Sequence, residues 1–140
     1  MRDLTQEEVA RRALEVACAR ADMETAKQLY SGDFVDHVNG EVFHGYEGIR
    51  HTITLYQRLF RDFAIRVDDQ VSEGDKVASR FTLSGSRAGR RVSVSGIVVS
   101  RFEDGKIVED WSITDTSSLM RQLGVRGTLA VAFTWLRSRS

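Results

Sequence analysis

Residues 102–123 read Phe-Glu-Asp-Gly-Lys-Ile-Val-Glu-Asp-Trp-Ser-Ile-Thr-Asp-Thr-Ser-Ser-Leu-Met-Arg-Gln-Leu, and this stretch decides the fold. Asp104-Gly105 is typical of the tight turn of a β-hairpin, and the period-two alternation after it predicts a strand. Successive side chains of a strand point to opposite faces, so one face is expected to carry Ile107, Glu109, Trp111, Ile113 and Asp115. Carboxylates are costly to bury in a plain core. We therefore interpret this mixed face as the wall of a pocket that holds Asp115.

The rest of the chain predicts helices first and a sheet afterwards. Helices are expected over residues 6–20 behind a Thr5 capping box, over 22–30 behind Asp22, and over 46–60. A short hairpin turned at Asn39-Gly40 separates the last two helices. Four strands, at residues 64–71, 76–84, 91–102 and 106–115, follow with short turns and therefore predict an antiparallel meander. The order predicts one α+β domain over residues 1–140, with a core at 5–124 and a C-terminal extension at 125–140 that is compatible with a helix.

Composition narrows the possible partners. The chain of 140 residues has 20 Lys and Arg against 20 Asp and Glu, so its formal net charge of zero gives no indication of a nucleic-acid or membrane partner. The same balance leaves self-association unopposed, which favours a homodimer or homotetramer. A single cysteine, Cys18, excludes an intrachain disulfide. No signal-peptide pattern or apolar segment of about 20 residues is present, so we expect a cytoplasmic location.

The order and spacing of several short segments resemble the SnoaL-like polyketide cyclases of the NTF2-like superfamily over roughly residues 5–124. The segments that carry this resemblance are Asp36-His37, Gly45–Ile49, Glu73–Val77 and Arg101–Gly124. The resemblance implies a cone in which a curved sheet wraps around helices and encloses an apolar pocket. It also implies intramolecular aldol closure of an aromatic polyketide, without cofactor or metal. An aspartate on the final strand is the acid/base group of the family, and Asp115 matches that position.

Asp115 and His37 are accordingly the candidate catalytic residues. Asp115 would carry the proton, and burial beside Trp111 would raise its pKa toward the working pH. The plain alternative is an aspartate that caps the turn at residues 116–118. His37 would orient a substrate carbonyl or tune Asp115, or else serve a structural role in the hairpin.

The candidate substrate-binding residues are mostly aromatic and are expected to form a flat wall: Trp111, Tyr56, Phe60 and Phe34. Arg80 and Glu109 complete this set and are expected to pair across neighbouring strands. Strand alternation places Asp110 on the opposite face, where we expect a solvent role. The three histidines lack metal-ligand spacing, so no metal site is expected.

Several other functions fit the same fold. The superfamily includes isomerases, hydroxylation-associated proteins and epoxide hydrolases, the last with an Asp-Arg-Asp arrangement for which Arg80 or Arg101 is available. A non-catalytic binding or dimerisation module is also open, because a fold does not choose among functions. In each catalytic case the expected partner is a small apolar or aromatic molecule.

Overall fold

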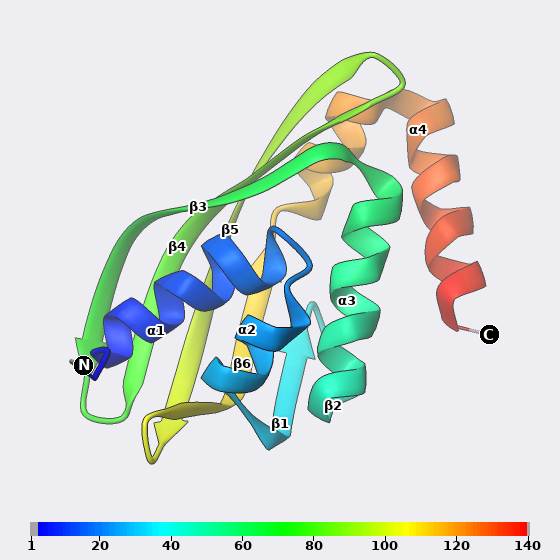
Figure 1. Ribbon diagram of the computed structural model, residues 1–140. Helices are drawn as coiled ribbons and strands as arrows, with labels where there is room; N and C mark the ends of the chain where they lie inside the picture. The colour runs from blue at the N-terminus through cyan, green and yellow to red at the C-terminus, as the bar shows by residue number, and fades with distance from the viewer. Residues whose placement is uncertain (1–2, 140) are drawn as a thin grey trace.

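The computed structural model describes residues 3–139 and has helices packed into the hollow of one curved sheet (Figure 1). The elements in chain order are α1 (Gln6–Arg12), a π-helical turn (Ala13–Cys18), α2 (Met23–Leu29), β1 (Tyr30–Val38), β2 (Glu41–His44), α3 (Gly45–Leu59), β3 (Arg61–Glu73), β4 (Lys76–Arg87), β5 (Arg90–Glu103), β6 (Lys106–Thr114) and α4 (Thr116–Arg139). The predicted α+β class is confirmed.

Helices α1 and α2 begin where their capping residues predict. Thr5 Oγ1 accepts a hydrogen bond from the backbone N–H of Glu8 at 3.1 Å, and Asp22 Oδ1 accepts one from Thr25 at 3.1 Å. The ends differ slightly from the prediction. The first helix finishes in the π-helical turn at Cys18, and α2 finishes at Leu29 because the next residue already starts β1.

The sheet has the strand order β2-β1-β6-β5-β4-β3. The predicted meander from β3 to β6 is antiparallel throughout, and the predicted hairpin turn has positive φ at both Asn39 (50°) and Gly40 (87°). The sequence did not predict that β1 pairs with β6 in parallel. This pairing brings the early hairpin beside the last strand, and it positions the candidate site.

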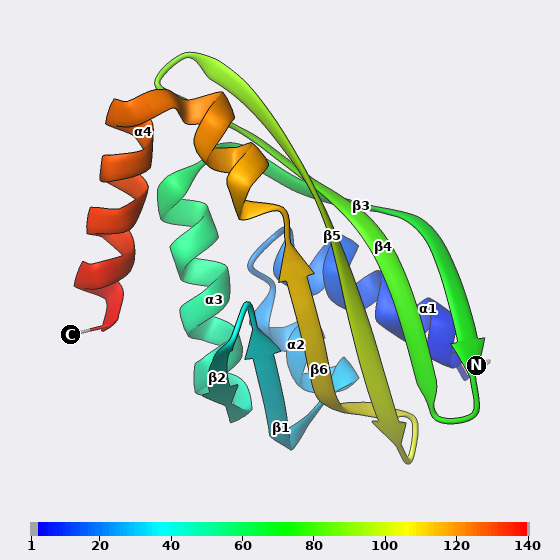
Figure 2. The same ribbon diagram turned by 180° about the vertical axis from the view of Figure 1, so that it is seen from behind.

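Helices α1, α2 and α3 lie against the concave face of the sheet, and Figure 2 shows the opposite, convex face in front of them. The core fills the space between the helices and the concave face, and its most deeply buried members include Ala17, Ala26, Phe34, Val77 and Ile107. Gly96 in β5 makes room for this packing, because a Cβ there would lie 2.5 Å from the Phe81 ring.

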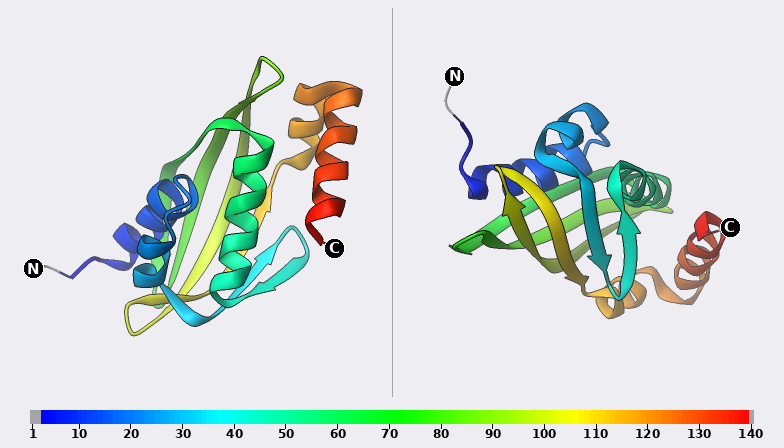
Figure 3. Two further views of the ribbon diagram at one scale, coloured as in Figure 1. Left: turned by 45° about the vertical axis from the view of Figure 1, so that its right-hand side comes forward. Right: turned by 90° about the horizontal axis from the view of Figure 1, so that it is seen from below.

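The C-terminal helix α4 is broken once. Gly124 has φ 72° and ψ −174°, and after it the helix turns back and runs beside α3 at some distance from it (Figure 1 and Figure 3). The predicted C-terminal helical extension is therefore present, and α4 begins earlier than expected, at Thr116. Among the described residues there is no helix with the length and apolar character needed to cross a membrane.

Candidate active site

A bulge in β6 changes which of its side chains face the interior. Phe102 of β5 pairs with Ile107, but the preceding residue of β5, Arg101, pairs with Glu109. Val108 is therefore an extra residue without a partner on β5, and it reverses the alternation beyond it. Ile107 is fully buried before the bulge, and Asp110 faces the interior after it.

The predicted common face of β6 is therefore wrong. Trp111 and Ile113 point outward from the convex face of the sheet, with 38% and 72% of their surface exposed. Asp110, predicted to face solvent, is only 7% exposed. Regular alternation held for each half of the strand, and the single residue Val108 put the halves out of phase.

Asp115 lies at the end of β6 and forms the N-cap of α4. Its Oδ1 accepts a hydrogen bond from the backbone N–H of Ser118 at 2.9 Å, and its carbonyl accepts one from Leu119 at 3.2 Å. The side chain is exposed, so the predicted burial beside Trp111 is absent. The geometry is that of the plain alternative, a cap.

His37, Glu109 and Arg101 form a polar cluster on the convex face. His37 Nε2 lies 2.8 Å from Glu109 Oε2, and Arg101 Nη2 donates to Glu109 Oε1 at 3.1 Å. The His37 ring also stacks on Trp111, with 5.5 Å between centroids. These contacts, the one to His37 above all, hold the pKa of Glu109 below its usual range. None of these four side chains lines either of the two chambers described below.

Arg80 does not pair with Glu109 as predicted. Its Nε donates to Asp69 Oδ1 at 2.9 Å, and its Nη1 lies 3.7 Å from Asp68 Oδ2. The chain thus has an Asp-Arg-Asp group, but the group lies outside both chambers. Phe34 is also outside them, because it packs in the core against Tyr30 at 4.6 Å between ring centroids.

An apolar chamber of about 500 Å³, called the outer chamber here, opens between α3, α4 and the sheet. Its residues are Asn39, Glu41, Leu55, Tyr56, Leu59, Phe60, Phe63, Leu83, Ser84, Gly85, Val92, Val94, Thr114, Thr116, Leu119, Met120 and Leu136. Tyr56 and Phe63 stack with 5.1 Å between centroids and 6° between planes, and Phe60 continues the row at 6.2 Å. Two of the four predicted wall residues, Tyr56 and Phe60, therefore line a chamber.

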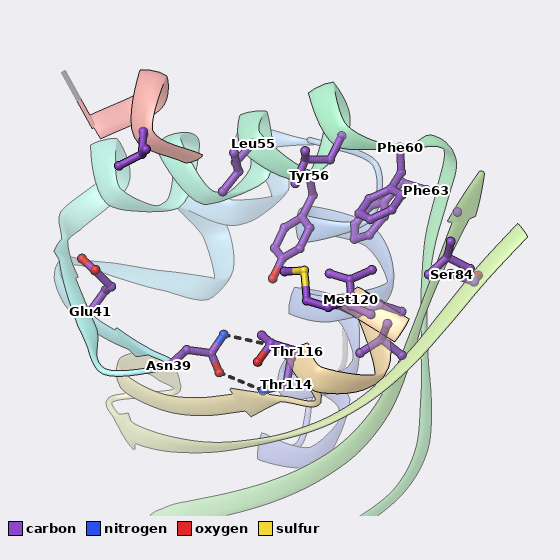
Figure 4. A pocket seen from close by; sticks show the side chains of 17 residues that line it. Asn39, Glu41, Leu55, Tyr56, Phe60, Phe63, Ser84, Thr114, Thr116 and Met120 are labelled. Atoms are coloured by element: carbon purple, nitrogen blue, oxygen red, sulfur yellow. Dashed lines mark hydrogen bonds between the residues drawn. The ribbon is translucent and has the colours of Figure 1, made fainter. Parts of the chain in front are cut away.

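The opposite side of the outer chamber is polar. Figure 4 shows Asn39 and Thr114 across the chamber from the aromatic row. Asn39 Oδ1 accepts from the backbone N–H of Thr114 at 2.9 Å, and its Nδ2 donates to Thr114 Oγ1 at 3.0 Å. The chamber is thus flat and apolar on one side and able to form hydrogen bonds on the other.

A smaller space of about 80 Å³, the inner chamber, adjoins the outer one and shares Tyr56, Leu83 and Thr114 with it. Asp36 of β1 and Asp110 of β6 both line it. They are register partners in the parallel β1–β6 pair, so their side chains lie next to each other on the same face. Asp110 Oδ1 is buried with no hydrogen-bond partner among the described residues.

Burial makes both carboxyl groups weak acids. It raises the pKa of Asp36 to about 7, against a smaller opposing effect from the charge of His37. Burial and the negative charge of Asp36 together raise the pKa of Asp110 well above its usual value, although a hydrogen bond from Ser100 opposes this. Because the two groups interact, they titrate as a pair and share the resistance to ionisation.

The other polar groups around the inner chamber are neutral. Burial raises the pKa of Tyr56 to about 12 and that of the Cys18 thiol also to about 12. The Cys18 sulfur lies 3.7 Å from the Tyr30 hydroxyl, and a thiol with this pKa is not a nucleophile at neutral pH. Among residues 3–139, no three His, Cys, Asp or Glu side chains are grouped so that they could hold a metal ion.

Sequence reasoning missed both carboxylates of the inner chamber, although one signal was available. Asp36 lies between Phe34 and Val38 on the alternating strand β1, and these two neighbours are buried. The alternation therefore puts an acid on a buried face, which is the reasoning that was applied to Asp115. Asp110 had no such signal, because the bulge is not visible in the sequence.

Comparisons with known proteins identify the family and the fold of the chain. The family model described as SnoaL-like polyketide cyclase matches residues 8–123, whereas no curated protein matches the chain. IdmH from Streptomyces antibioticus, provisionally described as a polyketide cyclase, has a similar structure with a TM-score of 0.77 and 28% identity, over 87% of this chain and 100% of its own. TsrD from Streptomyces laurentii has a TM-score of 0.72 and 30% identity, over 85% of this chain and 92% of its own.

These neighbours share the α+β, NTF2-like architecture, and the family match covers most of the domain, including both strands that carry the paired carboxylates. The chain therefore belongs to the SnoaL-like polyketide cyclase family.

Proposed function

We propose that this protein closes a ring in an apolar, carbonyl-rich molecule of the polyketide type by an aldol reaction, with Asp36 and Asp110 as its acid/base pair. The observation that carries the proposal is the position of these two carboxyl groups. They are neighbours on parallel strands, and they line a small chamber at the end of a large apolar one.

A pair of carboxyl groups that holds one proton would suit the reaction. An aldol closure removes a proton next to a carbonyl, stabilises the enolate and protonates the alkoxide that forms. The neutral Asp110 donates a hydrogen bond to the carbonyl oxygen, and the Asp36 carboxylate takes the proton from the adjacent carbon. The enolate carbon then bonds to the second carbonyl carbon. The proton on Asp36 returns to the new alkoxide, so the enzyme ends as it began.

The outer chamber suits a planar substrate with polar edges. Its volume of about 500 Å³ lies in the range of ligand sites, roughly 300–1,000 Å³. The row formed by Tyr56, Phe63 and Phe60 would stack on a flat ring system. Asn39 and Thr114 would accept and donate hydrogen bonds at its edge. Substrates of this shape are the ones we expect the protein to take.

Among the alternatives, isomerisation uses the same pair of carboxyl groups, because it also moves a proton between carbons. Epoxide hydrolysis by an Asp-Arg-Asp group has less support, since the group made by Asp68, Arg80 and Asp69 lines neither chamber. The aldol reaction remains our choice because it is the reaction of the family.

The test compares three single substitutions of the same chemistry, Asp110→Asn, Asp36→Asn and Asp115→Asn, by steady-state turnover of tricyclic polyketide ketones. We expect the first two to lower kcat by about 100-fold or more, which is the usual contribution of a general acid or base. Asp115→Asn should keep most of the activity, because asparagine also caps helices. The opposite pattern, with turnover lost only in Asp115→Asn, would show that Asp115 is the acid/base group and would contradict the proposal.

We also propose that the protein is a homodimer that buries the convex face of its sheet. Trp111 and Ile113 are exposed there, together with Ile97, which is 52% exposed and pairs with Ile113 in the sheet. Ion pairs of Arg101 and Arg80 border this apolar area, so both signs of charge are present around it. Such a face, apolar in the middle and polar at the rim, is typical of interfaces.

A further inference from the structure

Leu136 lines the outer chamber although it lies near the C-terminal end of α4. The family model ends at residue 123, immediately before the break in α4 at Gly124. The segment at residues 125–139, called the C-terminal segment here, thus lies outside the match and still contributes a side chain to the chamber. It is a feature of this chain that the family assignment does not explain.

The part of α4 before the break is fixed to the sheet. Leu123 is buried, and the Gln122 side chain bridges to Ser93 of β5 by accepting from its N–H at 3.0 Å and donating to its carbonyl at 2.7 Å. Arg90 Nη1 also donates to the Gln122 carbonyl at 3.4 Å. The C-terminal segment therefore starts from a fixed position, because Gln122 and Leu123 hold the residues next to Gly124 against the sheet.

The backbone of Gly124 sets the direction of the C-terminal segment. Its φ of 72° lies in the left-handed region that favours glycine, and among the described side chains a Cβ there would have only Arg90 Nη1 within 4 Å, at 3.9 Å. The turn sends the segment back along α3, which carries Tyr56 of the aromatic row and is followed directly by Phe60 (Figure 3). The segment consequently ends beside the chamber and not away from it.

The apolar character of the segment fits a surface that a ligand covers. Residues 129–136 read Leu-Ala-Val-Ala-Phe-Thr-Trp-Leu and contain no charge. Leu129 and Leu136 are 65% and 63% exposed, and of these two only Leu136 borders the chamber. An exposed leucine at the edge of an apolar chamber loses contact with water when an apolar molecule fills that chamber, and this favours binding.

We propose that Leu136 is a ligand-contacting residue and that the C-terminal segment covers the outer chamber, so that it determines how firmly long apolar molecules are held. The ligands concerned are those that extend from the aromatic row toward α4. The inference rests on the proposed function only in taking the outer chamber as the ligand site, and it does not depend on which residue moves the proton.

The experiment measures binding of the neutral fluorescent dye N-phenyl-1-naphthylamine to the full chain and to the variants Leu136→Asp and Leu129→Asp. The two leucines are almost equally exposed and lie on the same helix, so each substitution adds the same charge to a similar surface. We expect Leu136→Asp to raise the Kd about tenfold, as loss of a leucine contact does, and Leu129→Asp to leave it unchanged. Equal effects of the two variants, or none from Leu136→Asp, would overturn the proposal.

Two further variants separate this inference from the proposed function. Gly124→Ala strains the turn and should weaken dye binding as Leu136→Asp does, with the helix content by circular dichroism unchanged in both. Asp110→Asn should bind the dye like the original protein, because the dye has no carbonyl for Asp110 to contact. If Asp110→Asn loses turnover while Leu136→Asp keeps full dye affinity, the proposed function stands and the role of Leu136 is disproved.

Discussion

Asp36 and Asp110 lie side by side on the inner face of the β1–β6 pair, where burial opposes the ionised form of each. A carboxyl group whose pKa is higher in the folded chain than in the unfolded chain stabilises the fold while it is protonated. That stability is complete below the unfolded pKa of about 4 and is lost as the pH rises through the folded pKa, which is about 7 for Asp36. The protein should therefore be more stable at pH 5 than at pH 8.

Urea unfolding between pH 4 and pH 8 tests this expectation, and the variant Asp36→Asn serves as the comparison. A pKa that differs by one between the folded and the unfolded chain corresponds to about 1.4 kcal/mol, so the free energy of unfolding should fall by a few kcal/mol across that range. The variant should show a much smaller fall, because its amide does not ionise. A profile that is equally steep in both proteins would show that Asp36 is not the titrating group.

Asp115 has a different expected role, as the residue that caps α4. Its side chain accepts the N–H of Ser118 at the start of α4. Asp115→Ala should lower the free energy of unfolding by about 1 kcal/mol, the usual cost of losing an N-cap, whereas Asp115→Asn should cost much less. Thermal unfolding of the two variants provides the measurement, and an unchanged stability of Asp115→Ala would mean that the cap contributes nothing.

At the scale of elements, Gly96 of β5 is a position where the sheet has no room for a larger side chain. A Cβ there would lie 2.5 Å from Phe81 Cζ and 2.9 Å from the carbonyl oxygen of Ile113. Gly96→Ala should therefore destabilise the fold by roughly 1–3 kcal/mol, as overpacking does. Gly32→Ala is the control, because in the described part of the chain its Cβ would meet nothing closer than the Tyr46 ring at 3.8 Å. Chemical denaturation of both variants decides the point, and a neutral Gly96→Ala would show that Phe81 can move aside.

The elements also show how far the sequence alone was informative. Local signals at Thr5, Asp22 and Asn39-Gly40 predicted three element boundaries, because each is a hydrogen bond or a backbone conformation set by neighbouring residues. The phase of β6 beyond Val108 was wrong, because a bulge depends on the partner strand. The pairing of Asp36 with Asp110 was not predicted for a similar reason, since it needs the parallel pairing of two strands that are far apart in the chain.

For the whole molecule, the expected dimer makes the convex face of the sheet the sensitive surface. Trp111→Arg would place an unpaired charge at the centre of the proposed interface, and we expect it to give a monomer at micromolar concentration in sedimentation equilibrium. Leu4→Arg adds the same charge at an exposed apolar residue that precedes α1, and it should leave the dimer intact. If the unsubstituted protein is itself a monomer, the proposed dimer is disproved.

The extra residue in β6 also bears on how the chambers of related chains can be compared. Removal of the one codon for Val108 would bring β6 into unbroken register with β5 and would keep Asp110 on the inner face and Trp111 on the outer face, because Ile107 and Glu109 would then be consecutive residues paired with Phe102 and Arg101. A single insertion or deletion at this point can thus change the sequence pattern of the strand without changing which residues face the ligand. Relatives with and without this residue need a gap here before their aspartates are compared, because equal sequence positions would otherwise lie on opposite faces.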